Sequence, residues 1–235
     1  MNKFAILLLL CVCSVSSARA QVAFAPEVGI SNCYMKIIAP TPFRTLSSGS
    51  IIGTKLGGIM DVDMGTHLYF QTGLFFNIKG NTKSFGANIH DTFVVNVDQS
   101  LQINYFELPI NVIFKTNLQG RGRIFFGLGA SVGMVVGGRN LFHIYGFSTT
   151  NHIDDETNTK IQGGQDVSKV DAGLNFMAGY EFRSGMFLRA FYNYGFTDIA
   201  TSADESDKNR GYGISMGFFL SNSKRHSPIN ELIAE

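Results

Sequence analysis

The residues best suited to hydrolytic chemistry lie between positions 143 and 156. His143, Ser148 and Glu156 are a base, a nucleophile and a carboxylate. A catalytic triad is defined by its geometry in space, and spacing along the chain does not supply that geometry. Chance matches of this kind are common. We therefore interpret the three as solvated loop residues and predict no catalytic residue.

Metal and cofactor patterns are equally weak. Residues 154–156 (DDE) group three carboxylates but lack the spaced ligands and turn glycine of a calcium loop. No His and Cys stand at zinc-binding spacing. The glycines of segment 127–129 (GLG) lie in a predicted strand with no helix behind them to hold a phosphate. Cys33 has no basic residue or histidine beside it that would activate its thiol. We predict no metal site and no cofactor.

The first twenty residues have the layout of a secretory signal peptide. Lys3 is followed by an apolar run over 4–15 and by a small-x-small cleavage site over 18–20. The run is too short for a membrane-spanning helix, although a short N-terminal anchor helix is the alternative. Loss of 1–20 would remove two of the three cysteines, so no internal disulfide can form.

The expected mature chain is nearly neutral. Removing Lys3 and Arg19 leaves 17 basic against 18 acidic residues, a net charge of −1. This balance gives no indication of nucleic-acid binding. Charged residues make up only 16% of the sequence, while Gly (26) and Phe (21) are abundant. Soluble domains carry about 25% charged residues, so the composition suggests a surface that does not face water.

Hydrophobicity alternates with a period of two along most of the chain, which predicts β-strands. Eight strands are expected, over residues 22–31, 53–64, 68–79, 105–115, 124–136, 171–182, 186–196 and 211–220. Short connections at 63–66, 116–122 and 184–185 alternate with long polar ones at 32–50, 80–99, 138–167 and 197–210. Outer-membrane barrels have this asymmetry, with short periplasmic turns and long extracellular loops.

Alternation alone does not decide which face of the strands looks outward. A soluble lipocalin-like barrel would place its apolar residues inside. Here the polar set is rich in Gly, Ser and Asn, which suit a crowded lumen, and it is too poor in charge to solubilise an outer surface. We therefore predict an all-β, antiparallel, up-and-down transmembrane barrel over 21–221, followed by a periplasmic tail over 222–235.

With this orientation, nine charged residues of both signs should face the lumen. They are Glu27, Lys55, Asp61, Glu107, Lys115, Arg123, Asp171, Glu181 and Arg189. A buried, unpaired charge costs several kcal/mol, so we interpret them as a structural network of ion pairs. The alternative is a polar path for a small solute or a proton, which a lumen only wide enough for its own side chains disfavours.

Four segments carry motifs in the order of one known family: 104–110 (NYFELPI), 127–133 (GLGASVG), 170–181 and 192–199 (YNYGFTDI). They resemble, in turn, the YLEIPL strand, the GxGxxxG strand and the ending of PorT-like outer-membrane β-barrel proteins of the Bacteroidetes. The resemblance implies a location and a fold more than an activity. The namesake branch serves a protein secretion system, but its Arg/Asn-rich turn is replaced here by LQGRG at 118–122.

These patterns together predict a non-enzymatic bacterial outer-membrane protein with a structural, surface-interaction or accessory envelope role. Its expected partners are the membrane lipid and an envelope or surface partner bound through the long loops, because rigid scaffolds carry binding on their loops. We expect a monomeric barrel that binds no nucleic acid. The alternatives are a porin-like small-solute channel, a lipid-modifying enzyme and, if the faces are reversed, a soluble lipocalin-like binder.

Overall fold

The computed structural model describes residues 22–38, 45–89, 93–147, 152–199 and 206–220. These contain nine β-strands. They are β1 (Val22–Ile38), β2 (Thr45–Asp63), β3 (Leu68–Ile89), β4 (Phe93–Lys115), β5 (Gly122–Phe147), β6 (His152–Ile161), β7 (Val170–Phe182), β8 (Met186–Gly195) and β9 (Ser206–Phe218). The expected signal peptide, the whole of the expected tail and Ser148 lie outside the described residues.

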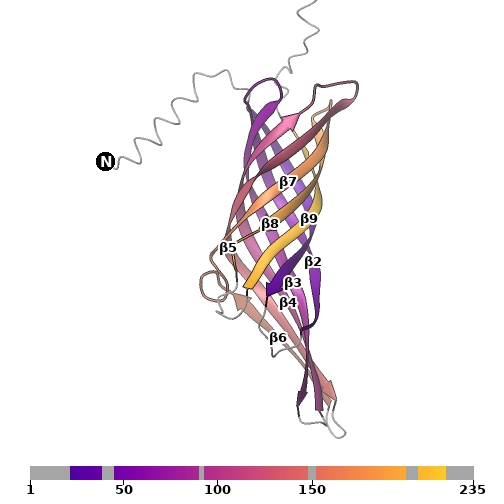
Figure 1. Cartoon of the computed structure of the whole chain (residues 1–235), viewed down its shortest axis with the longest axis vertical. Coiled ribbons are helices and arrows are strands. Elements are labelled where there is room, and N and C mark those ends of the chain that lie inside the picture. The colour runs from indigo at the N-terminus through magenta and orange to yellow at the C-terminus, as the bar shows by residue number, and fades with distance from the viewer. Residues whose placement is uncertain (1–21, 39–44, 90–92, 148–151, 200–205, 221–235) are drawn as a thin grey trace, which may run out of the picture.

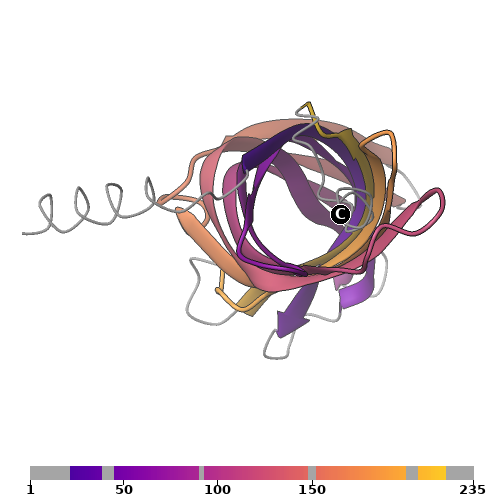
Figure 2. The same cartoon turned by 90° about the horizontal axis from the view of Figure 1, so that it is seen from above.

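Eight of the strands close a barrel (Figures 1 and 2). The order is β4-β3-β2-β1-β9-β8-β7-β5, and the ring closes because β4 also pairs with β5. Every pairing around it is antiparallel, including that of the first strand with the last, where Val28 lies opposite Met216. The predicted up-and-down barrel with eight wall strands is confirmed. β6 stands outside the ring and pairs only with β5.

The outer wall of the barrel is apolar. Outward-facing side chains on every wall strand are large and exposed, for example Leu56 at 62% and Leu128 at 55%. On β5 the outward run extends from Ile124 to Val136. Its twelve steps, at about 3.3 Å each and a tilt of about 40°, cover about 30 Å. This is the thickness of a bilayer's hydrocarbon core.

The short connections join strands at one end of the barrel. In the turn between β7 and β8, Gly185 adopts a φ of +97° and its amide donates to the Phe182 carbonyl at 3.0 Å. Gly120, in the turn between β4 and β5, also has a positive φ, of +57°. Positive φ values are open to glycine at little cost. The start of β1 lies at this end too, since Leu220 donates to the Phe24 carbonyl.

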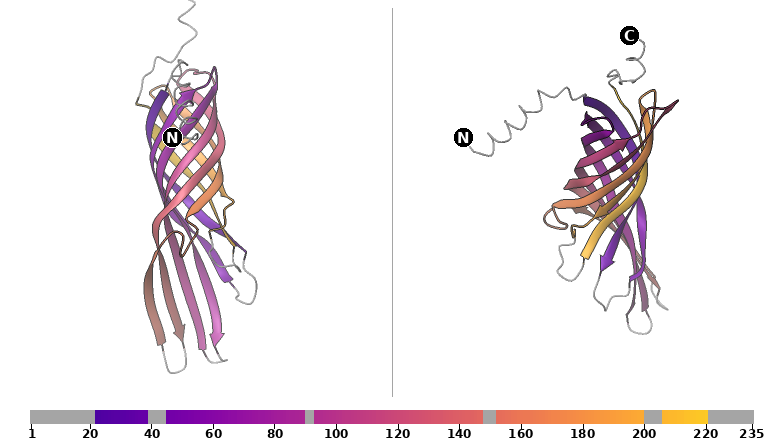
Figure 3. Two further views of the ribbon diagram at one scale, coloured as in Figure 1. Left: turned by 90° about the vertical axis from the view of Figure 1, so that its left-hand side faces the viewer. Right: turned by 45° about the horizontal axis from the view of Figure 1, so that its top comes forward.

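At the opposite end, the structure corrects the expected long loops. β3 and β4 run on through most of 80–99, and β5 and β6 fill most of 138–167. Together they form a four-stranded sheet that extends beyond the barrel rim (Figures 1 and 3). The polarity of these segments predicts loops. In a hairpin, however, the backbone donors and acceptors of each strand bond to those of its partner strand. A strand can therefore form even where its side chains are polar. We call this extension the protruding sheet.

Among the described residues, the structure has no helix that meets the length and hydropathy requirements for crossing a bilayer.

Candidate functional site: the barrel lumen and the protruding sheet

The structure places all nine of the sequence-selected charged residues on the inner side of the wall. Seven are at least 96% buried, and the side chains of Lys55 and Arg123 are 16% and 14% exposed. Their partners come from different strands, so each pair crosses the lumen or spans neighbouring strands. Three buried or half-buried charges were absent from that selection: Lys79, Lys83 and Asp207.

One cluster of charges occupies the lumen at the short-turn end. The Lys115 ammonium lies 2.6 Å from Asp61 and 3.1 Å from Glu181. Arg123 binds both oxygens of Glu181 and also donates to the Tyr69 hydroxyl at 3.2 Å. Two cations and two carboxylates from four strands therefore neutralise one another. We call these four residues the turn-end cluster.

A second cluster centres on Glu27. Its carboxylate contacts Lys55 at 3.2 Å and Arg189 at 3.0 Å, and accepts a hydrogen bond from Ser215 at 2.7 Å. The Lys55 ammonium also lies 4.0 Å from the centre of the Phe75 ring. One carboxylate thus serves two cations, and aromatic faces provide the rest of their surroundings.

The third cluster has the opposite balance. Lys79 lies 2.6 Å from Glu107 and 3.7 Å from Asp171. Asn209 donates from its amide nitrogen to Asp171 at 2.9 Å and to the Tyr105 hydroxyl at 3.0 Å. A cation is shared here by two carboxylates, so the surplus charges of the second and third clusters cancel.

Nearer the protruding sheet, Lys83 contacts Asp207 at 2.9 Å. In total, the four groups bring together six cations and six carboxylates. The lumen therefore has no net charge that would favour anions over cations. Lys79 could have been found from the sequence, because side chains alternate along a strand and Lys79 falls on the same face as Tyr69 and Gln71. Asp207 could not, because its segment had been assigned to a loop.

Phenylalanine and glycine fill the lumen by direct pairing across the strands. Four inward-facing phenylalanines each stand opposite a glycine in the register. The pairs are Phe75 with Gly57, Phe125 with Gly179, Phe187 with Gly217 and Phe191 with Gly213. Each ring lies where a Cβ on the paired glycine would point. The abundance of both residue types follows from this packing.

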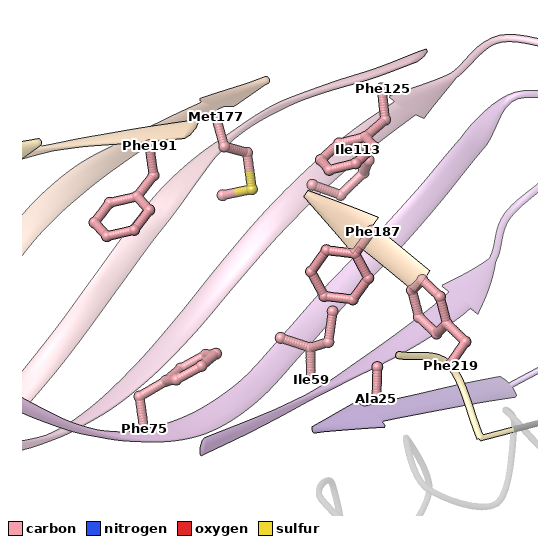
Figure 4. Close-up of a cluster of buried hydrophobic side chains, with 9 residues drawn as sticks. All are labelled: Ala25, Ile59, Phe75, Ile113, Phe125, Met177, Phe187, Phe191 and Phe219. Atoms are coloured by element: carbon pink, nitrogen blue, oxygen red, sulfur yellow. The ribbon is translucent and has the colours of Figure 1, made fainter. Parts of the chain in front are cut away.

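These four rings form one buried apolar layer together with Ala25, Ile59, Ile113, Met177 and Phe219 (Figure 4). We call it the phenylalanine layer. A second apolar layer lies nearer the protruding sheet and contains Met35, Leu101, Ile103, Tyr105, Val135, Ile161, Val167 and Ile199. Along β4, Ile113 belongs to the first layer, Glu107 to the ion pairs and Ile103 to the second layer. The polar centre is therefore enclosed on both sides.

Little free space remains between the layers. A cavity beside Lys55, Lys79 and Asp171 offers about 20 Å³ to a water-sized sphere. One oxygen of Asp171 and the amide oxygen of Asn77 face no hydrogen-bond partner in the protein. A space of this size and polarity suits a buried water molecule. Cys33 lines the same cavity, 5% exposed, with its sulfur 3.2 Å from the Ser31 hydroxyl.

Two of the three residues considered for hydrolysis, His143 and Glu156, lie on the protruding sheet. His143 on β5 contacts Asp154 on β6 at 2.7 Å, while Glu156 stands opposite it in the register. The hydrogen bond to the Asp154 carboxylate raises the pKa of the His143 imidazole. Both side chains are open to solvent, at 44% and 61%. Among the described residues, no hydroxyl is hydrogen-bonded to His143, and no group of metal ligands is assembled.

Comparison with known proteins gives a family match. A family model described as "Outer membrane protein beta-barrel domain" matches residues 16–201. No curated protein matches the chain.

Several solved structures are similar to this one at low identity. Ail, the attachment invasion locus protein of Yersinia pestis, in complex with the heparin analogue sucrose octasulfate, is 12% identical with a TM-score of 0.34. The match covers 84% of this chain and 99% of that one. Neisserial surface protein A is 8% identical with a TM-score of 0.36, over 84% and 98%. The N-terminal β-barrel domain of Pseudomonas aeruginosa OprF is 11% identical with a TM-score of 0.27, over 82% and 97%.

Proposed function

The chain belongs to the outer-membrane β-barrel domain family, and from this premise we propose that it is a closed, non-enzymatic barrel that presents its protruding sheet to partners outside the cell. It lies in the outer membrane. The observation that carries the proposal is the lumen, in which ion-pair clusters that together are neutral lie enclosed by two apolar layers. Such a barrel serves as a rigid scaffold for the protruding sheet.

Closure of the lumen argues against the porin-like alternative. A hydrated solute would have to displace the phenylalanine layer and the layer that contains Ile103 and Ile199, which are 0% and 1% exposed. It would also have to separate ion pairs such as Arg189 with Glu27, and leaving one partner buried and unpaired costs about 3–5 kcal/mol. Both barriers lie in series along the same path.

The protruding sheet supports a role in surface interaction. It rises from a rigid barrel, and its last strand, β6, has one unpaired edge. Acidic side chains of β6, including Asp154 and Glu156, are exposed beside His143. An exposed, rigidly held surface is the usual site of binding on a scaffold protein. We propose that a surface or envelope partner contacts the protein here.

We also propose that the chain is a PorT-like member of the Bacteroidetes branch, as the segments at 104–110 and 192–199 suggest. A role without catalysis is supported by the open setting of the His143–Asp154 pair, since the base of a hydrolytic triad is hydrogen-bonded to an oriented nucleophile in a sheltered site. Unchanged lipid A in cells carrying His143→Ala would support this interpretation. An altered lipid A profile would favour the lipid-modifying enzyme.

Planar-bilayer recording tests the closed lumen. The detergent-extracted protein should give no conductance steps in a bilayer where an added general porin gives them. A shift in gel mobility on boiling would show that the same preparation is folded. Regular steps from the folded protein would refute closure and leave the channel as the better account.

Cysteine labelling on intact cells tests display of the protruding sheet. A membrane-impermeant maleimide should label a Thr157→Cys variant, since Thr157 lies on exposed β6. The matched Arg121→Cys variant, at the short-turn end, should be labelled only after the cells are permeabilised. The reverse pattern would place the sheet in the periplasm and refute the proposed display.

A further inference from the structure

Two cations face outward on β9 where its lipid-facing run ends. From the short-turn end, the outward side chains of this strand are Phe218, Met216, Ile214 and Tyr212, all at least 45% exposed. The next two in the same parity are Arg210 and Lys208. These two cations therefore lie on the outer wall at the edge of the apolar band, where the lipid headgroups begin.

Arg210 has an unused hydrogen-bonding capacity. Its guanidinium lies 4.1 Å from the centre of the Tyr194 ring. Its Nε is buried and has no hydrogen-bond partner. Within the described part of the chain, neither Arg210 nor Lys208 pairs with a carboxylate. In the lumen six cations are balanced by six carboxylates. Arg210 and Lys208 differ from this pattern, because they form no ion pair among the described residues.

Aromatic side chains from both neighbouring strands lie beside Arg210. Tyr34 on β1 stands opposite Arg210 in the register, and the Tyr212 hydroxyl accepts a hydrogen bond from Asn32 at 3.2 Å.

The opposite side of the barrel repeats the arrangement. On β5 the outward apolar run ends at Val136, and the next outward side chain beyond the bulge is Arg139. It stands opposite Lys160 of β6, and its Nε donates to the Gln102 side chain at 2.8 Å. No described carboxylate pairs with Arg139 or Lys160 either. Unmatched cations thus mark the end of the apolar band on two separated strands.

We propose that Arg210 and Lys208 bind the phosphate of a phosphorylated lipid headgroup in the outer leaflet. A guanidinium presents a planar fork of donors that matches phosphate oxygens, and Lys208 adds a second positive charge. Stacking on Tyr194 holds the fork in one orientation. Because the site continues the lipid-facing wall, the acyl chains of the same lipid lie along Ile214 and Met216. This continuity identifies a lipid phosphate as the occupant in preference to free phosphate.

Lipid bound to the full-length protein tests the proposal. The protein is extracted in mild detergent from a host whose outer leaflet contains phosphorylated lipid A, and the lipid A retained per barrel is measured by native mass spectrometry. In Lys208→Gln/Arg210→Gln, retention should fall at least about tenfold, because a lost charge-assisted hydrogen bond costs about an order of magnitude in affinity. Arg121→Gln/Arg183→Gln removes the same charge from the short turns and should leave retention unchanged.

A second measurement needs no variant. Delipidated wild-type protein is titrated with lipid A and with the same lipid lacking its phosphates. Binding of the phosphorylated lipid alone supports a phosphate site, whereas equal binding of both overturns it. The proposal is also overturned if Lys208→Gln/Arg210→Gln retains as much lipid as the wild type, or if the turn variant loses as much. Gel mobility shifts on boiling confirm that each preparation is folded.

Discussion

Replacing Glu27 with glutamine should be among the most damaging single changes to the barrel. The substitution keeps the side-chain volume and removes one negative charge. Glu27 is 2% exposed and, among the described residues, is the only carboxylate that forms an ion pair with Lys55 or Arg189. Without it, two buried cations lose their partner. Breaking a buried ion pair from one side costs about 3–5 kcal/mol, and we expect Glu27→Gln to destabilise the barrel by that amount.

The assay is equilibrium urea unfolding from lipid vesicles. The chain contains no tryptophan, so tyrosine fluorescence and circular dichroism report the transition. Glu156→Gln is a suitable control because it neutralises an exposed carboxylate on the protruding sheet, where a substitution changes stability by about 0.5 kcal/mol or less. Adding Arg189→Met to Glu27→Gln should restore part of the loss, because it removes one of the stranded cations.

A different outcome would refute the reasoning. If Glu27→Gln lowers the free energy of unfolding by less than about 1 kcal/mol, the carboxylate does not hold the two cations. If the double variant with Arg189→Met is less stable than Glu27→Gln by the full cost of the second change, the two side chains act independently.

Three further predictions concern the phenylalanine–glycine pairs, the lipid-facing wall and the protruding sheet. Gly179→Ala should cost about 1–3 kcal/mol in urea unfolding, because a Cβ there overlaps the Phe125 ring and a backbone oxygen; an unchanged midpoint would contradict the paired packing. Val132→Arg should cost about 2–4 kcal/mol in the same assay, since this side chain faces lipid, and a neutral effect would contradict that orientation. By NMR titration, the raised pKa of His143 should fall in Asp154→Asn. The stabilisation from this pair is fully present below the pKa of an unfolded histidine and is lost as pH rises through the higher folded value, so a pair that strengthens with rising pH would contradict the assignment.

The wall of the barrel could be predicted from the sequence because its two faces differ so strongly. Alternation over 171–182 and 186–196 sets the parity of each residue, and one-residue errors would move every side chain to the wrong face. The ends of the strands could not be predicted in the same way. Segments 80–89 and 93–99 contain enough polar residues to interrupt the alternation, and the sequence therefore does not reveal that they pair with each other. The ninth strand, β6, was missed for this reason.

Part of the lumen could also be predicted. Parity was enough to assign Glu27, Lys115 and Arg189 to the inside, but it does not say which charges meet. The contact between Arg189 and Glu27 joins residues 162 positions apart in the chain. It depends on the pairing of β1 with β9, which brings the first and last strands of the barrel together. The pairing of Phe187 with Gly217 likewise requires the register and not the pattern of either strand alone.

The central claim is that the apolar face of the wall meets lipid and the charged face is sealed inside. Quenching by lipids with brominated acyl chains tests it most directly, with a fluorophore on single cysteines in a Cys33→Ser background. The account predicts strong quenching at Leu128→Cys and Ile214→Cys and none at Thr157→Cys on the protruding sheet. Absence of quenching at Leu128→Cys and Ile214→Cys in a folded barrel would contradict it and would mean that these side chains line an interior.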